Sequence, residues 1–410
     1  MKLNVKFWLK FSLINLCIVA LLGVLMRYKI GFAFPYFEQK NLQHSHSHFA
    51  FSGWVSHTLM TVMIYYLQTK IEAFNGGKYK KIIVANLICS YGMLVFFFFQ
   101  GYGVISILFS TASVFVSYAF AYQFIKDLKL LNTDLLSKNW FKAALFFNVI
   151  STLGTYYLAY IMATKKFVQD IYLSSVYYYL HFQYNGWFFF ACMGLFFGYL
   201  NLKKTDHPFF ETIFKLFTIA CFPVYFLSLL WLNLPVWLYV ITVIGASVQV
   251  FAWFKFLYIL IQSKKIELLN LTPLLSYILL FISIALSIKL LLQLGSTIPY
   301  VSQLAFGFRP IVVAYLHLVL LAIISLYLIF YTKANHLFFS TKKLKFGIFI
   351  FLIGVILNET ILAIQGIASF SYTAIPYVNS ILFSIAIILF VGILITTYFS
   401  LKKDKKNPPL

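Results

Sequence analysis

Apolar runs of about 20 residues recur along almost the whole chain, and each is long enough for an α-helix to cross a hydrocarbon core ~30 Å thick. Of the 410 residues, 62% are hydrophobic and 10% are charged, and the mean hydropathy is +0.89. A soluble domain carries about 25% charged residues. The sequence therefore predicts an all-α, polytopic membrane protein whose main partner is the lipid bilayer.

Polar connectors divide the apolar runs into about twelve predicted transmembrane helices within one transmembrane domain, residues 1–410. The predicted spans are residues 6–27, 44–68, 82–102, 104–126, 140–163, 174–201, 209–232, 236–262, 271–293, 310–332, 345–367 and 376–400. The four cysteines, Cys17, Cys89, Cys192 and Cys221, all lie inside these runs without CxxC spacing, which is typical of packing residues.

The net charge of +22 is not gathered in one patch, and we expect no nucleic-acid partner. Most lysines lie in alternate connectors, at residues 2–10, 70–81, 126–142, 203–204, 264–265, 333–345 and 402–406. Cytoplasmic connectors of membrane proteins are enriched in Lys and Arg. This distribution predicts a multi-pass protein with both termini in the cytoplasm.

Two predicted helices share a seven-residue pattern, His-Phe-x-aromatic-x-Gly-Trp. It begins at His48 and ends at Gly53-Trp54, and it recurs from His181 to Gly186-Trp187, 133 residues later. His317 follows after another 136 residues, without the Gly-Trp pair. The spacing predicts three four-helix pseudo-repeats, roughly residues 1–135, 136–266 and 267–410, which share one orientation in the membrane.

Six of the eight histidines lie in, or at the outer mouth of, the second helix of a predicted repeat: His44, His46, His48, His57, His181 and His317. His207 and His336 fall in connectors and are interpreted as surface residues. Polar side chains at membrane depth are functional candidates, although each imidazole can also simply hydrogen-bond a neighbouring helix. Three histidines in repeat register favour metal or haem ligation.

The run His44-Ser-His46-Ser-His48 allows two conformations. In a helix, His44 and His48 share one face and His46 aligns with His57 further along. In an extended segment, all three alternate as on a strand. Such a cluster suits capture of copper or zinc, or it consists of hydrogen-bonded polar residues at the mouth of the helix bundle.

Two more ionisable residues, Lys289 and Glu359, are predicted at the depth of the histidines. A buried charge in a membrane requires a partner. These two side chains are expected to pair with each other, to contact a cofactor or to pass protons.

The segment His46-x-His48-x4-Gly53-Trp54 resembles the haem-ligand helix of haem-copper oxidase subunit I, especially in cb-type oxidases and nitric oxide reductases. It is also similar to a bacterial family of haem- and copper-containing proteins linked to nitric oxide stress. The resemblance implies that haem b has two axial histidine ligands. One is His317, and the other is His48, or else His46 or His44. It implies that His181 is a copper or second-metal ligand. Arg309 would pair with a haem propionate or serve as a topological anchor.

The sequence departs from that family at the binuclear centre. The predicted helices 209–232 and 236–262 contain no histidine, and 310–332 contains only one. Asn185 replaces the oxidase tyrosine, with Tyr184 and Tyr177 nearby. A complete haem-copper centre is therefore not expected, and the catalytic residues stay unassigned.

The resemblance implies an oxidoreductase-like haem protein of a bacterial inner membrane, working in electron transfer or in binding or detoxification of NO or O2. Its partners would be electron-donor or respiratory-complex subunits. Two alternatives stay open: a histidine-lined transporter for a transition metal or protons, and a structural subunit that has lost its cofactors. A coloured protein would distinguish the first interpretation from both alternatives.

Overall fold

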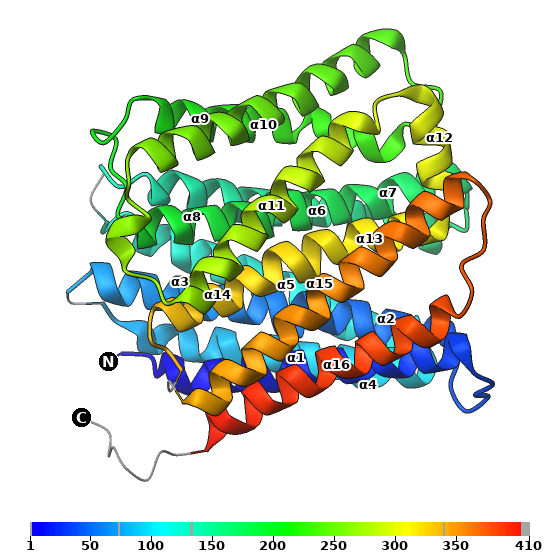
Figure 1. Cartoon of the computed structure of the whole chain (residues 1–410), viewed down its shortest axis with the longest axis horizontal. Helices are drawn as coiled ribbons and strands as arrows, with labels where there is room; N and C mark the ends of the chain where they lie inside the picture. Colours follow the sequence, from blue (N-terminus) through cyan, green and yellow to red (C-terminus); the bar gives the residue numbers. More distant parts are fainter. Residues whose placement is uncertain (1, 73, 132–133, 339–340, 403–410) are drawn as a thin grey trace. The chain divides into compact units, whose positions relative to one another are not determined.

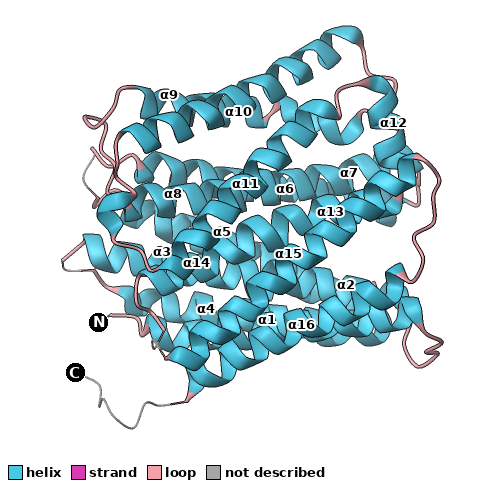
Figure 2. Cartoon of the chain, in the orientation of Figure 1, coloured by secondary structure: helices cyan, strands magenta, loops and turns pink. Residues whose placement is uncertain are grey.

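The computed structural model describes residues 2–72, 74–131, 134–338 and 341–402. The chain is 83% helix, and the described residues contain no β-strand, only one isolated bridge between Leu135 and Lys203 (Figures 1 and 2). The predicted all-α class is confirmed.

Among the described residues, nine helices are long and apolar enough to cross a membrane. They are Val5–Gly31, Gly76–Gln100, Val104–Leu128, Ser137–Thr164, Val236–Gln262, Pro273–Gly295, Arg309–Ala334, Lys342–Phe370 and Val378–Leu401. A tenth is the pair Phe209–Cys221 and Pro223–Leu229, bent by 40°. Large apolar side chains such as Leu108 and Phe115 are exposed on these helices, which fits a multi-pass protein in contact with lipid.

The predicted number of twelve is not confirmed, and the difference has a physical reason. The two predicted spans outside the set of ten, residues 44–68 and 174–201, are helical over Gln39–Lys70 and Gln169–Tyr199. Each contains the polar residues of a candidate site, including His48 and His181. Those residues lower the hydropathy of the helix without breaking it.

The chain divides into two compact units, and the division falls within α5, α11 and the helix Arg309–Ala334. The first unit comprises Met1–Tyr122, Pro273–Ile278 and Ser325–Leu410, and the second comprises Gln123–Thr272 and Leu279–Ile324. The first contains α1 (Val5–Gly31), α2 (Gln39–Phe49), η1 (Ala50–Ser56), α3 (His57–Lys70), η2 (Gly76–Tyr79), α4 (Lys80–Gln100), most of α5 (Val104–Leu128), α14 (Leu326–Ala334), α15 (Lys342–Phe370) and α16 (Val378–Leu401). The second contains α6 (Ser137–Thr164), α7 (Gln169–His181), η3 (Phe182–Phe188), α8 (Phe189–Tyr199), α9 (Phe209–Cys221), η4 (Pro223–Leu229), α10 (Val236–Gln262), η5 (Glu267–Leu269), most of α11 (Pro273–Gly295), α12 (Pro299–Gly307), α13 (Arg309–His317) and most of η6 (Leu318–Ser325).

In the first unit, α16 lies side by side with α15 and also packs against α1 (Figure 1). Glycines allow the close approach of α15 and α16. A Cβ at Gly392 would lie 2.5 Å from the backbone nitrogen of Phe351, and one at Gly347 would lie 2.8 Å from that of Thr396. Small residues serve this purpose in membrane helices, where dispersion contacts replace the hydrophobic effect between helices.

In the second unit, α6 packs against α7, η3 and α8. Trp140 of α6 is fully buried, and its ring centroid lies 5.2 Å from Phe190 and 5.3 Å from Phe197 of α8. At Gly154 of α6, a Cβ would lie 2.6 Å from the carbonyl oxygen of Ser175, so α6 and α7 also meet backbone to backbone. This packing holds the helix that carries His181.

Candidate functional site

A π-helical segment begins within two residues after each of the three histidines His48, His181 and His317. The segments are η1, Ala50–Ser56; η3, Phe182–Phe188; and η6, Leu318–Ser325. π-Helices account for well under ~1% of residues in proteins and are frequent at functional sites. These segments were not predictable from the sequence. Their recurrence makes these histidine-bearing helices the candidate functional elements of both compact units.

Before the amino-terminal end of η1, the run from His44 to His48 is helical, so the helical alternative is confirmed. His44 and His48 share one face of α2, because both rings pack against Phe97 and Tyr102. The His48 ring stacks on Phe97 at 4.1 Å, and its Nε2 lies 3.2 Å from the Tyr102 hydroxyl. His44 Nε2 is buried and has no hydrogen-bond partner in the described part of the chain.

The other two histidines of this helix have different neighbours. The Cε1 atom of His46 lies 3.8 Å from the position that a Cβ would take at Gly23 of α1. His57 is fully buried and donates from Nε2 to the Trp8 carbonyl at 3.3 Å. Its Nδ1 is buried and makes no hydrogen bond within the described ranges.

Buried polar side chains bond the backbone carbonyls of η1. Asn15 of α1 donates from Nδ2 to the Gly53 carbonyl and accepts from the Tyr91 hydroxyl at 2.7 Å. Asn86 of α4 donates to the Ser52 carbonyl at 3.3 Å. None of these three residues was predicted from the sequence, although an intramembrane asparagine is itself a sign of a polar site.

The two tryptophans of the shared pattern are buried. Trp54 donates from Nε1 to the Ser325 hydroxyl at 2.8 Å, and both residues belong to the first unit. Trp187 lies in η3 and is almost fully buried. The preceding glycines are sterically required, since a Cβ would lie 2.7 Å from the ring of Phe49 at Gly53 and 2.6 Å from Phe147 Cβ at Gly186.

In the second unit, His181 uses both ring nitrogens in hydrogen bonds to the protein. Nε2 lies 2.8 Å from the Cys221 carbonyl and Nδ1 lies 3.1 Å from Asn185 Nδ2. A carbonyl only accepts and an amide nitrogen only donates, so His181 is neutral with its proton on Nε2. A metal at His181 would have to displace one of these partners.

The Cys221 carbonyl, which His181 binds, lies where the helix changes its hydrogen-bond pattern. In a regular helix, the Cys221 carbonyl would accept from the backbone N–H of Tyr225, four residues on. The helix changes to 3₁₀ geometry at Pro223, and Tyr225 donates to the Phe222 carbonyl at 3.2 Å instead. The bend therefore presents an acceptor to His181 that the sequence did not indicate.

Other polar residues hold η3 in place. Gln183 donates from Nε2 to Asn148 Oδ1 at 3.0 Å and to the Ser151 hydroxyl at 2.8 Å, both on α6. Tyr184 is buried, and its ring lies 6.3 Å from that of Tyr315 on α13. Tyr177 contacts the Phe306 ring of α12 at 6.1 Å.

His317 is the last residue of α13 and immediately precedes η6. Its Nδ1 donates to the Val313 carbonyl at 2.9 Å, which places the lone pair of the neutral ring on Nε2. A histidine that ligates a metal usually makes such a bond with its other nitrogen. Arg309 begins α13 with an exposed side chain.

Three predicted pairings stay predictions. His48 belongs to the first unit and His317 to the second, and the same is true of Glu359 and Lys289. Glu359 accepts a hydrogen bond from Asn358 at 3.1 Å, and Lys289 is almost fully buried in α11. The predicted contact of Arg309 with a propionate depends on a ligand.

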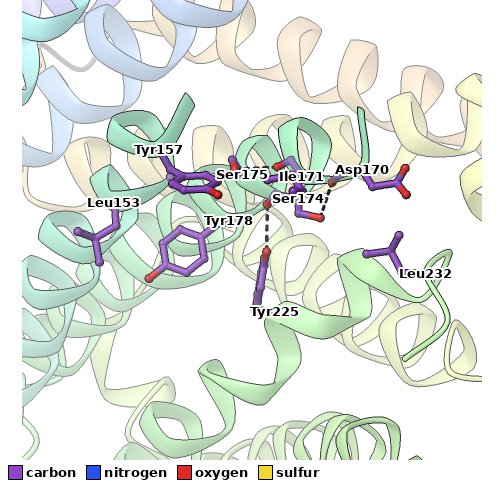
Figure 3. A pocket seen from close by; sticks show the side chains of 10 residues that line it. Leu153, Tyr157, Asp170, Ile171, Ser174, Ser175, Tyr178, Tyr225 and Leu232 are labelled. Carbon is purple, nitrogen blue, oxygen red and sulfur yellow. Dashed lines mark hydrogen bonds between the residues drawn. The ribbon is translucent and has the colours of Figure 1, made fainter. Parts of the chain in front are cut away.

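A groove of about 490 Å³ lies in the second unit between α6, α7 and η4. Three tyrosines line it, and Figure 3 shows the Tyr225 hydroxyl pointing to the backbone of Ser174, to whose carbonyl it donates at 3.0 Å. The Asp170 carboxylate projects away from the tyrosines. The Tyr225 ring also lies 5.9 Å from the His181 ring, so this tyrosine lines the groove and contacts the histidine.

Within the described residues, no three His, Cys, Asp or Glu side chains lie close enough together to hold a metal ion. No protein-family model and no curated protein matches the chain.

Proposed function

We propose that this chain is a haem-binding membrane protein with a fold like that of haem-copper oxidase subunit I, without a complete haem-copper centre. In this proposal His48 and His317 are the axial ligands of haem b. The protein would serve in electron transfer or in binding or detoxifying a small gas such as NO or O2. The observation that carries the proposal is the π-helical segment that begins within two residues after each of the three histidines.

Both proposed ligands have suitable surroundings. The hydrogen bond from His317 Nδ1 to Val313 fixes the tautomer and leaves Nε2 as the nitrogen with a lone pair. The stack on Phe97 fixes the plane of the His48 ring, and Nε2 would exchange the Tyr102 hydroxyl for the metal. When bound, a haem supplies one-electron transfer and an iron that binds small gases.

The residues around η1 are proposed to position His48. Asn15 and Asn86 bond the carbonyls of Gly53 and Ser52, so the π-helical geometry next to His48 is fixed from two neighbouring helices. His181 has a different role in this proposal. Its two ring nitrogens bond Cys221 and Asn185, and it is not needed as an axial ligand.

The test is the absorption spectrum of the full chain, purified after expression with ample haem. We expect a Soret band and a low-spin spectrum. His48→Ala and His317→Ala should each abolish it or convert it to high spin, whereas His181→Ala should leave it largely intact. His336→Ala, in an exposed connector position, is the matched control.

Purely structural histidines give a different result. Each substitution would then lower stability by about 1 kcal/mol without a spectral change. A colourless wild type would refute the proposal and favour the transporter. If the wild type is coloured and both alanine variants keep its spectrum, the axial ligands would instead be His181 and either His46 or His44.

A further inference from the structure

Two tyrosines and an aspartate present unused polar groups in the groove between α6, α7 and η4. Tyr157 and Tyr178 line this groove of about 490 Å³, and neither hydroxyl forms a hydrogen bond within the described part of the chain. The Asp170 carboxylate lies at the opposite end of the groove in Figure 3 and has no ion-pair or hydrogen-bond partner among the described residues. Asp170 and Tyr178 are eight residues apart on α7, which is about 12 Å along a helix. The groove therefore offers an acceptor at one end and two donors at the other.

The apolar part of the groove lies on the exposed side of a membrane helix. Leu153 and Tyr157 of α6 are 56% and 44% exposed, and α6 is long and apolar enough to cross a membrane. Ile171 and Leu232 complete this apolar lining. Tyrosines with an apolar ring and a polar tip are typical of the region where helices meet lipid headgroups. The lining therefore fits an occupant from the bilayer that has both an apolar chain and a polar head.

Charged residues of both signs lie at the carboxylate end of the groove. Lys165 and Lys166 are exposed in the connector 165–168 between α6 and α7, and Asp170 follows in the first turn of α7. Four residues of chain span at most about 14 Å, so Lys166 and Asp170 are within reach of one headgroup. A purely cationic ligand would meet the two lysines, and a purely anionic ligand would meet Asp170. A zwitterionic lipid headgroup matches both charges.

We propose that this groove is a binding site for phosphatidylethanolamine. The lipid ammonium donates to the Asp170 carboxylate, and the phosphate lies toward Lys166. The hydroxyls of Tyr157 and Tyr178 donate to the ester oxygens of the glycerol, and an acyl chain continues along Leu153. Phosphatidylcholine has the same charges, but its quaternary ammonium has no N–H group to donate, so the charge-assisted hydrogen bond is lost. The site uses none of the proposed axial ligands, so its failure and that of the haem proposal are distinguishable.

The experiment is native mass spectrometry of the full chain in detergent, titrated with phosphatidylethanolamine, phosphatidylcholine and phosphatidylglycerol that share oleoyl chains. We expect the wild type to bind phosphatidylethanolamine about two- to fivefold more tightly than phosphatidylcholine, which is the gain from a solvent-exposed charge pair. Phosphatidylglycerol, which lacks an ammonium, should also bind more weakly. Asp170→Asn should remove the preference for phosphatidylethanolamine over phosphatidylcholine. Glu267→Gln, at an exposed position in η5, is the matched control and should keep this preference.

The tyrosines are tested separately, because they contact a part that both lipids share. Tyr178→Phe should weaken the binding of phosphatidylethanolamine and phosphatidylcholine by similar factors. Tyr277→Phe, which changes a tyrosine that is 66% exposed on α11, is the control and should leave both affinities unchanged.

A lipid series keeps the test decisive if Asp170→Asn does not fold. Phosphatidylethanolamine with one and then two N-methyl groups should bind the wild type progressively more weakly, as N–H donors are lost. Equal binding of phosphatidylethanolamine and phosphatidylcholine by the wild type would overturn the proposal, and so would an Asp170→Asn variant that keeps the preference. Phosphatidylglycerol that binds as tightly as phosphatidylethanolamine would also overturn it, since the lysines of the connector alone would then hold the phosphate.

Discussion

Replacing Gly392 by alanine tests how closely α15 and α16 approach each other. The added Cβ would lie 2.5 Å from the Phe351 nitrogen and 2.8 Å from the Phe351 Cα, whereas ordinary contact begins at 3.4 Å. Both neighbouring atoms are backbone, so no side-chain rotation relieves the overlap. The two helices must therefore separate locally by about 1 Å, which also loosens the contacts of Gly347 and Gly354 with α16.

Two opposing effects determine how much Gly392→Ala changes the free energy of unfolding. Overpacking of this kind destabilises proteins by about 1–3 kcal/mol. Alanine in place of glycine within a helix stabilises by up to about 1 kcal/mol. We therefore expect Gly392→Ala to lower the free energy of unfolding by about 1–2 kcal/mol, since the steric effect exceeds the gain in helix propensity.

The assay is reversible unfolding in mixed micelles with increasing SDS. Gly295→Ala, at the end of α11, is the control, because no atom lies within 4 Å of its added Cβ. It should change stability by less than about 0.5 kcal/mol, as surface substitutions do. A Gly392→Ala variant as stable as the control would show that α15 and α16 are further apart than described.

Two further predictions concern a connector and the topology. Burial alone would raise the pKa of Asp206, but hydrogen bonds from Lys265 and the Lys203 backbone, with the charges of both lysines, lower this pKa below its ordinary value of 3.8. Because the pKa of Asp206 is lower in the folded protein than in the unfolded chain, its carboxylate stabilises the folded protein above about pH 4, and this contribution is lost as the pH falls further. The difference in stability between the wild type and Asp206→Asn should therefore shrink from about pH 6 to pH 3. Its size should be about 0.5 kcal/mol, because the pair is partly exposed; a difference that grows on acidification would contradict the assignment. Cysteines introduced as Val168→Cys and Lys402→Cys should react with an impermeant thiol reagent from opposite sides of the membrane, and labelling from one side only would refute the predicted orientation.

Hydropathy was sufficient to predict the helices, because their apolar length is set by the bilayer. It was not sufficient to count them. The helices that carry His48 and His181 are long enough to cross a membrane, but the polar residues of the candidate site lower their mean hydropathy. The π-helical segments were not predictable either, since the apolar pattern of η1 or η3 does not distinguish i→i+5 from i→i+4 hydrogen bonds.

The candidate site was predictable only as a set of histidines. That His44 and His48 share a face follows from helical periodicity, and the structure confirms it. The bond from His181 to the Cys221 carbonyl joins residues 40 positions apart and depends on the bend at Pro223. Asn15 and Asn86 were overlooked because a single buried asparagine in a long apolar run has no motif around it.

The π-helical segments have a consequence for the comparison of related sequences. Each contains one more residue per turn than the flanking helix, and one residue corresponds to about 100° of rotation. The direction in which His48 points is therefore independent of which face α3, the following helix, buries. An insertion or deletion of one residue within Ala50–Ser56 changes only the local rotation between α2 and α3. The same change inside α15 would rotate every later side chain of that helix away from α16. Among diverged sequences with this fold, length differences inside membrane helices should concentrate just after the three histidines, and an alignment that forbids gaps there will misplace these histidines.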